Sequence, residues 1–117
     1  MSDLNELPAA IRAFTADRDW GRFHDPKSLL LALMGEVGEL AELLQWLPAD
    51  EAATLVTSEP LHARVGEELS DVLIYLIQLA GACGVDLATA ATQKLSAAAQ
   101  KYPVAEFRGR APDRSGT

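Results

Sequence analysis

The sequence predicts an all-α fold, a bundle of four to five helices formed by one domain over residues 1–117. Two long runs, residues 29–46 and 67–80, place apolar side chains at the spacing of a helical face. The chain is 49% hydrophobic but only 6% aromatic, which is typical of a helical core built from Leu, Ala, Val and Ile. No strand-like alternation or internal repeat opposes this interpretation.

The first helix is expected over residues 5–18, because Leu7, Ile11 and Phe14 recur at i, i+4 and i+7. It is short, so we expect it to pack on the outside of the two long helices. Residues 20–25 then form a loop.

A second helix begins with Asp25 as its cap and Pro26 at its first position, and it ends before residue 48. Gly35 and Gly38 inside this helix cost about 1 kcal/mol each relative to alanine, which suggests close approach by another backbone or a ligand. Residues 48–60 lack a clear period and predict a surface connection with room for one helical turn.

The third helix runs from about residue 61 and ends near Gly84, a natural left-handed cap position. Asp86 can cap a fourth helix over residues 87–101. The tail, residues 104–117, is expected to be extended.

Each long helix carries two acids at i and i+3, Glu36 with Glu39 and Glu68 with Asp71. Such a pair is usually a solvated face. Here the helices are otherwise apolar, and antiparallel packing would bring the four carboxylates together. Two charges about 4 Å apart repel by about 4 kcal/mol at an effective dielectric of about 20, so a cluster needs protons or a cation. Carboxylates without His or Cys suit Mg²⁺, or Mn²⁺ as a substitute, and thus phosphate chemistry.

The two long helices are apolar over more than one stripe, and short helices in a monomer cannot bury all of that surface. We therefore expect homo-oligomerisation to complete the bundle. The residues expected to form the core stripes are Leu33, Val37, Leu40 and Leu44 on one helix and Leu69, Leu73, Leu76 and Ala80 on the other.

The acid pairs also carry a family resemblance. With RDWGRFHDPKSLLLALMGEVGELAELLQW around the first pair and KYP near the end, residues 14–109 resemble the MazG-like all-α nucleotide pyrophosphohydrolases, most of all the branch containing dCTP pyrophosphatase. The resemblance implies Mg²⁺-dependent hydrolysis of (deoxy)nucleoside triphosphates, with dCTP or modified dCTP favoured, to monophosphate and pyrophosphate. It also implies a homodimer or homotetramer whose interface helps build the active site.

The resemblance assigns roles to individual residues. The expected metal ligands and catalytic carboxylates are Glu36, Glu39, Glu68 and Asp71. One of these four is expected to activate water; the resemblance does not say which, and we favour Glu39. The expected substrate-binding residues are Trp20, Trp46, Tyr75, Lys94 and Tyr102, the tryptophans enclosing the base and Lys94 and Tyr102 lying near the phosphates. The chain departs from the family pattern at Ala98 and Ser28, where Asn is common, and at Ile11, where this branch has His.

Charge and hydropathy exclude some classes of partner. A net charge of −7 argues against a nucleic-acid polymer as ligand. The longest nearly apolar run, residues 72–85, is shorter than the roughly 20 residues of a membrane span, and no secretory signal is visible. The single cysteine, Cys83, is expected to be a small core residue in a reducing compartment, and we expect a cytoplasmic protein.

Two alternatives to this function stay open. One is a pyrophosphohydrolase of the phosphoribosyl-ATP type, which shares the helical scaffold and the acid pairs. The other is a non-catalytic helical dimer that serves as an adaptor and whose acids are merely solvated. Metal binding separates the adaptor from both enzymes.

Overall fold

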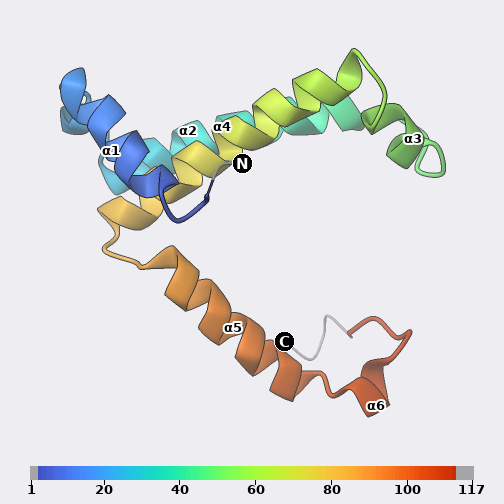
Figure 1. The fold of residues 1–117 in the computed structure, drawn as a ribbon. Helices are drawn as coiled ribbons and strands as arrows, with labels where there is room; N and C mark the ends of the chain where they lie inside the picture. Colours follow the sequence, from blue (N-terminus) through green and yellow to red (C-terminus); the bar gives the residue numbers. More distant parts are fainter. Residues whose placement is uncertain (1–2, 113–117) are drawn as a thin grey trace. The chain divides into compact units, whose positions relative to one another are not determined.

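A computed structural model of the chain describes residues 3–112, and every regular element within that range is helical (Figure 1). The all-α prediction is confirmed. The chain divides into two compact units, one ending at Gly84 and the other beginning at Val85.

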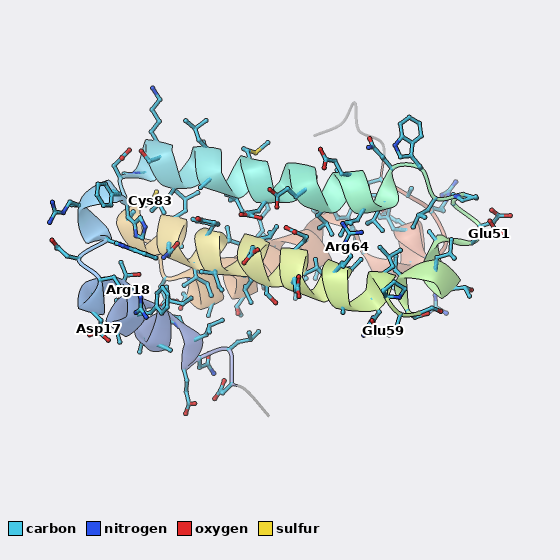
Figure 2. The ribbon with its side chains drawn as sticks, turned by 90° about the horizontal axis from the view of Figure 1, so that it is seen from above. Asp17, Arg18, Glu51, Glu59, Arg64 and Cys83 are labelled. Carbon is cyan, nitrogen blue, oxygen red and sulfur yellow. The ribbon has the colours of Figure 1, made fainter. Side chains whose placement is uncertain are left out.

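The first unit is built on two long helices, α2 (Pro26–Leu44) and α4 (Leu61–Ala82). They run antiparallel and lie side by side (Figures 1 and 2). Two further helices, α1 (Leu7–Asp17) and α3 (Ala52–Val56), pack against α4. The antiparallel pair is the arrangement that brings acids from both helices to one place.

Local chemistry sets the start of α2. Its cap, Asp25, accepts hydrogen bonds from the backbone nitrogen of Ser28 at 3.0 Å and from the Ser28 hydroxyl at 2.6 Å. These bonds stabilise the carboxylate and lower the pKa of Asp25. Pro26 occupies the first turn, where its missing N–H would be unpaired in any residue. The segment before it, expected to be a loop, contains the short 3₁₀ helix η1 (Gly21–Phe23).

The C-terminal end of α4 lies where the sequence predicts it. Gly84 adopts φ +67°, the left-handed conformation that favours glycine. Cys83 was expected in the core, and this is wrong, because it caps the helix where the chain turns away and its side chain is exposed.

The core of the first unit is sparse, and the expected stripes are only partly right. Within residues 3–112 the buried hydrophobic side chains are Ile11 and Leu29, which are 8% and 2% exposed. Val37 and Leu69, both expected to be core residues, are 41% and 51% exposed. Gly35 has nothing within 4 Å of where a Cβ would lie, and the same is true of Gly38, so no part of residues 3–112 makes the close approach expected there.

On α4 a different strip is covered. Val65, Glu68 and Val72 are half-buried and lie at i, i+3 and i+7, whereas Leu69 points away. The strip that contains Glu68 therefore faces the neighbouring helix, and residues 3–112 leave Leu69 and Leu76 of the leucine stripe exposed. Periodicity finds both strips, but it cannot say which of them the single opposing helix covers.

The second unit consists of α5 (Leu87–Lys101) and the short helix α6 (Val104–Phe107). Asp86 caps α5 as expected, by accepting a hydrogen bond from the backbone nitrogen of Thr89 at 3.1 Å. The tail, expected to be extended, instead begins with α6. Helix α6 is stabilised by an edge-to-face contact between the rings of Tyr102 and Phe107, whose centroids are 5.1 Å apart. Residues 113–117 of the expected tail lie outside the described range.

No single helix among the described residues is long and apolar enough to cross a membrane. The bent pair α4 and α5 reaches the required length and composition only when the two are taken together.

Candidate functional site

Four acids from α2 and α4 form the centre of the candidate site, and we call Glu36, Glu39, Glu68 and Asp71 the acid cluster. One carboxylate oxygen from each of the first three lies within 4.8 Å of the other two. The i, i+3 spacing puts both acids of each pair on neighbouring turns of one face. Asp71 is near enough for its charge to raise the pKa of both Glu36 and Glu68. The structure thus brings together the acids that the sequence singles out.

Two oxygens of the acid cluster are buried without a partner. Within residues 3–112, neither Oε2 of Glu36 nor Oε2 of Glu68 has a hydrogen-bond donor. Burial is the main cause that raises the pKa of Glu36 from 4.5 to about 7, and the adjacent carboxyls of Glu68 and Glu39 raise it further. Burial likewise raises the pKa of Glu68. Such atoms lack compensation for their lost hydration.

No cationic side chain among residues 3–112 forms an ion pair with the acid cluster. Between residues 3 and 112 the one ion pair joins Arg22 to Asp19, outside the cluster. An all-carboxylate set with two unpaired buried oxygens fits a hard divalent cation such as Mg²⁺ or Mn²⁺. The residues present therefore suit the metal that the sequence implies.

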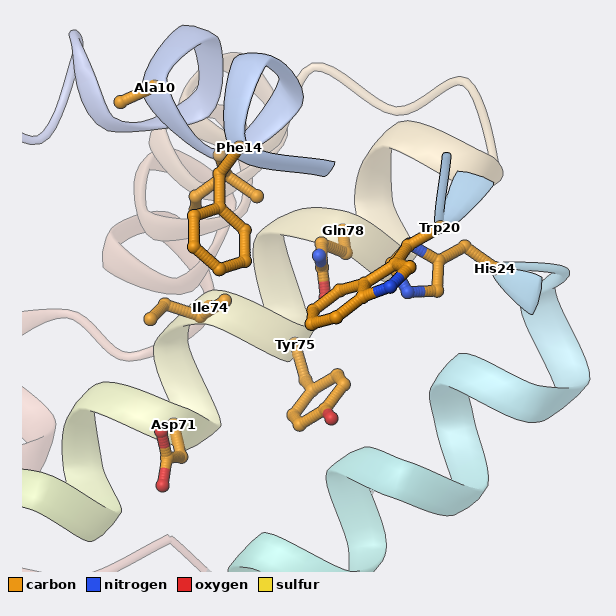
Figure 3. A pocket seen from close by; sticks show the side chains of 9 residues that line it. Ala10, Phe14, Trp20, His24, Asp71, Ile74, Tyr75 and Gln78 are labelled. Atoms are coloured by element: carbon orange, nitrogen blue, oxygen red, sulfur yellow. The ribbon is translucent and has the colours of Figure 1, made fainter. Parts of the chain in front are cut away.

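A pocket of 360 Å³ lies between α1 and α4, and we call it the α1–α4 pocket (Figure 3). Its lining is mostly aliphatic and aromatic. The residues are Ala10, Ile11 and Phe14 from α1, Trp20 and His24 from the connection, and Asp71, Ile74, Tyr75 and Gln78 from α4. This volume is within the range of small-molecule sites.

Asp71 belongs to both the acid cluster and the α1–α4 pocket, so the two features are continuous. Trp20, 45% exposed, stands at the pocket with its ring edge to face with Phe14 and the centroids 5.7 Å apart. Tyr75 lines the same space. A flat apolar group could therefore lie against the aromatic rings while a charged group extends towards the carboxylates.

Trp46 does not share this pocket. It follows the end of α2 and is 85% exposed, whereas Trp20 precedes the start of the same helix. Nineteen helical residues span about 28 Å, so one chain cannot place both tryptophans around one ligand.

Lys94 and Tyr102 belong to the second unit. Lys94 is exposed on α5, and the Tyr102 ring packs on Phe107 with the Lys101 ammonium 5.4 Å from its centroid. Their expected role beside phosphates stays a prediction.

Sequence reasoning missed several pocket residues. The sequence patterns give no sign that Phe14, Ile74 or His24 contacts a ligand, yet all three line the α1–α4 pocket. Gln78 had a usable signal, because it is a polar residue within the apolar run 72–85.

Comparisons with known proteins agree on one family. Residues 33–113 match the MazG-like family. The chain is 49% identical over 111 residues to dCTP pyrophosphatase 1 of Bos taurus, covering 95% of this chain and 64% of that protein. It is 48% identical over 103 residues to dCTP pyrophosphatase 1 of Homo sapiens, covering 88% and 59%. The chain thus spans less than two thirds of the length of these curated relatives.

A solved structure agrees in fold. The crystal structure of a pyrophosphatase from Archaeoglobus fulgidus is 33% identical, with a TM-score of 0.78, over 88% of this chain and 94% of that one.

Proposed function

Since this chain belongs to the MazG-like family, we propose that it is a nucleoside triphosphate pyrophosphohydrolase of the cytoplasmic nucleotide pool. It hydrolyses the bond between the α and β phosphates to give a monophosphate and pyrophosphate, and dCTP or a modified dCTP is the favoured substrate. The relatives named dCTP pyrophosphatase support this choice. The observation that carries the proposal is the set of unpartnered buried carboxylate oxygens that adjoins an aromatic pocket through Asp71.

The acid cluster would hold Mg²⁺, with Mn²⁺ as a substitute. When bound, the cation supplies positive charge that offsets the charge of the triphosphate. Glu36 and Glu68 each have a buried oxygen without a hydrogen-bond donor, and coordination of the cation would provide its partner. Asp71 and Glu39 complete the set from the two helices.

The remaining groups bind and orient the substrate. The base lies in the α1–α4 pocket against Trp20, Phe14 and Tyr75, and the phosphates extend past Asp71 to the acid cluster. Glu39 and Asp71 are the exposed members of the cluster, so bulk water reaches both, and we assign the activation of water to Glu39. It accepts a proton from the attacking water, and the apolar walls hold the nucleotide in line.

A second copy of the chain completes the site. The exposed large hydrophobic residues on the long helices are Leu30, Leu31, Met34, Val37, Leu69 and Leu76. A homodimer, or a homotetramer made of two dimers, would cover them. Because the two tryptophans of one chain lie too far apart, Trp46 can contact the base only from the other copy.

The test is release of pyrophosphate across a panel of canonical and base-modified nucleoside triphosphates and phosphoribosyl-ATP, with Mg²⁺ or with EDTA. We expect Mg²⁺-dependent release that is fastest for dCTP or a modified dCTP. Turnover of phosphoribosyl-ATP alone would replace the proposed substrate class. No turnover together with no thermal shift in Mg²⁺ or Mn²⁺ would favour a non-catalytic adaptor.

Variants test whether turnover depends on the acid cluster specifically or on any acidic residue of α4. Glu68→Gln and Asp71→Asn should each remove most turnover while the protein stays folded, because a ligand is lost and repulsion is relieved. Glu67→Gln, exposed on the same helix, is the matched control and should keep wild-type turnover. Equal loss in the control variant would contradict a specific role for the cluster.

A further inference from the structure

One polar side chain in the α1–α4 pocket is incompletely satisfied. The amide nitrogen Nε2 of Gln78 donates a hydrogen bond to Oγ1 of Thr15, at 3.4 Å. Its carbonyl oxygen Oε1 is buried and has no donor among the described residues. A buried acceptor without a partner is costly in a folded protein, so this oxygen calls for an explanation.

In this structure Thr15 contacts the nitrogen end of the Gln78 amide. Its hydroxyl holds the nitrogen of Gln78, and its backbone carbonyl accepts a hydrogen bond from the backbone nitrogen of Trp20 at 3.1 Å. One residue of α1 thus ties the pocket tryptophan to the pocket glutamine. The end of the Gln78 amide that remains is an acceptor.

The position of this acceptor suits a base edge. Gln78 extends into the pocket towards Trp20, with Tyr75 and Phe14 nearby (Figure 3). It lies about two turns along α4 from Asp71, which adjoins the acid cluster. A ligand with its flat ring among the aromatic side chains and its anionic end at the cluster would direct a ring substituent towards Gln78.

On the basis of the proposed function, we infer that Gln78 determines base specificity, its Oε1 accepting a hydrogen bond from the exocyclic amino group of the bound base. Bases that present an amino group there, such as cytosine, satisfy the oxygen. Bases that present a keto oxygen place a second acceptor against it and leave both unpaired. Because Oε1 is covered in the free protein, the side chains that cover it move aside when a base binds, while Nε2 keeps its hydrogen bond to Thr15.

Thr15 is a positioning residue in this scheme. Without its hydroxyl the amide can turn over and present its NH₂ group to the base. The kcat/KM for keto bases should then rise relative to that for amino bases, while kcat changes little.

The experiment compares kcat/KM for dCTP, for its 2-pyrimidinone analogue that lacks the 4-amino group, and for dUTP. The wild type should lose about tenfold or more when the amino group is removed. Gln78→Met, which keeps the side-chain length without the amide, should show a dCTP to analogue ratio near one. Gln78→Leu is a second variant in case the first misfolds, and Gln45→Leu, exposed at the end of α2, is the control that keeps the wild-type ratio.

Thr15→Val should raise the ratio of kcat/KM for dUTP to kcat/KM for dCTP while kcat stays unchanged. A merely structural role of Thr15 would not produce this change. A Gln78→Met protein that still prefers dCTP to the analogue as strongly as the wild type would overturn the inference.

Dissociation constants for the same three nucleotides, measured by calorimetry, separate this inference from the proposed function. Binding that depends on the amino group through Gln78, but without hydrolysis of any nucleotide, would refute the enzyme and support the base-reading role. Hydrolysis of dCTP together with no effect of Gln78→Met on the ratio of kcat/KM for dCTP to that for the analogue would support the enzyme and refute the role of Gln78.

Discussion

Replacement of Glu36 by glutamine tests the electrostatics of the acid cluster without any substrate. Burial raises the pKa of Glu36 to about 7 from an ordinary 4.5. At 1.36 kcal/mol per pH unit this corresponds to about 3 kcal/mol of lost stability at most. Because the side chain is partly exposed, solvent screening reduces the expected value to about 1 kcal/mol. For a domain of this size, that is a rise in Tm of about 5 °C in the Glu36→Gln protein at pH 8.

The sign depends on pH. Below about pH 4 the carboxyl is protonated in the folded and the unfolded chain, so the Glu36→Gln variant should gain nothing there. Between 4.5 and about 7 the unfolded chain has released its proton while the folded chain retains it. Wild-type stability therefore falls as pH rises through this window, and the glutamine variant escapes the loss.

The assay is thermal melting in EDTA from pH 4 to 8.5, with Glu42→Gln, exposed on the same helix, as the control. A Tm difference between wild type and Glu36→Gln that does not vary with pH would refute the reasoning. So would a lower Tm of the variant at pH 8, since it would show that a cation of the protein already pairs with Glu36.

Four further predictions concern the two tryptophans, the acid cluster and the core. Trp20→Ala should lower kcat/KM by about tenfold to a hundredfold, because stacking contributes about 1 to 3 kcal/mol per base, while the thermal shift in Mg²⁺ stays as in the wild type. Trp46→Ala should lower it by a similar factor, and unchanged kinetics in both variants would return the tryptophans to packing roles. Mg²⁺ binding near pH 6 should release protons from Glu36, so the calorimetric heat should vary with the ionisation enthalpy of the buffer; a buffer-independent heat would contradict this. Leu29→Ala should lower the free energy of unfolding by about 2 to 5 kcal/mol in urea titrations, whereas the same change at the exposed Leu31 should cost much less.

Local chemistry made most of the fold predictable. Asp25 and Asp86 each cap a helix where the sequence predicts, and Gly84 has the left-handed φ that ends α4. Such signals act over one or two helical turns, so a single sequence contains them in full. The face that α4 turns to its neighbour was not predictable, because Leu69 and Glu68 compete for one opposing helix and only tertiary packing decides between them.

The candidate site divides in the same way. The acid cluster could be predicted because each half is an i, i+3 pair and helical geometry fixes its spacing. The proposed role of Gln78 could not be predicted, since its partner Thr15 lies 63 residues away and the two meet only after α1 has packed on α4. The separation of Trp20 from Trp46 likewise follows from the length of α2 and not from either residue alone.

In the proposed binding mode, helix α4 sets the spacing between the two ends of the nucleotide. Asp71 and Gln78 are seven residues apart on one uninterrupted helix, a fixed rise of about 10 Å. The distance from the base edge to the phosphates is therefore set by a count of residues, independently of the chemistry at either end. A single residue inserted between the two would turn Gln78 by about 100° away from the pocket. Sequence variation should therefore change the residues at positions 71 and 78 more readily than the number of residues between them.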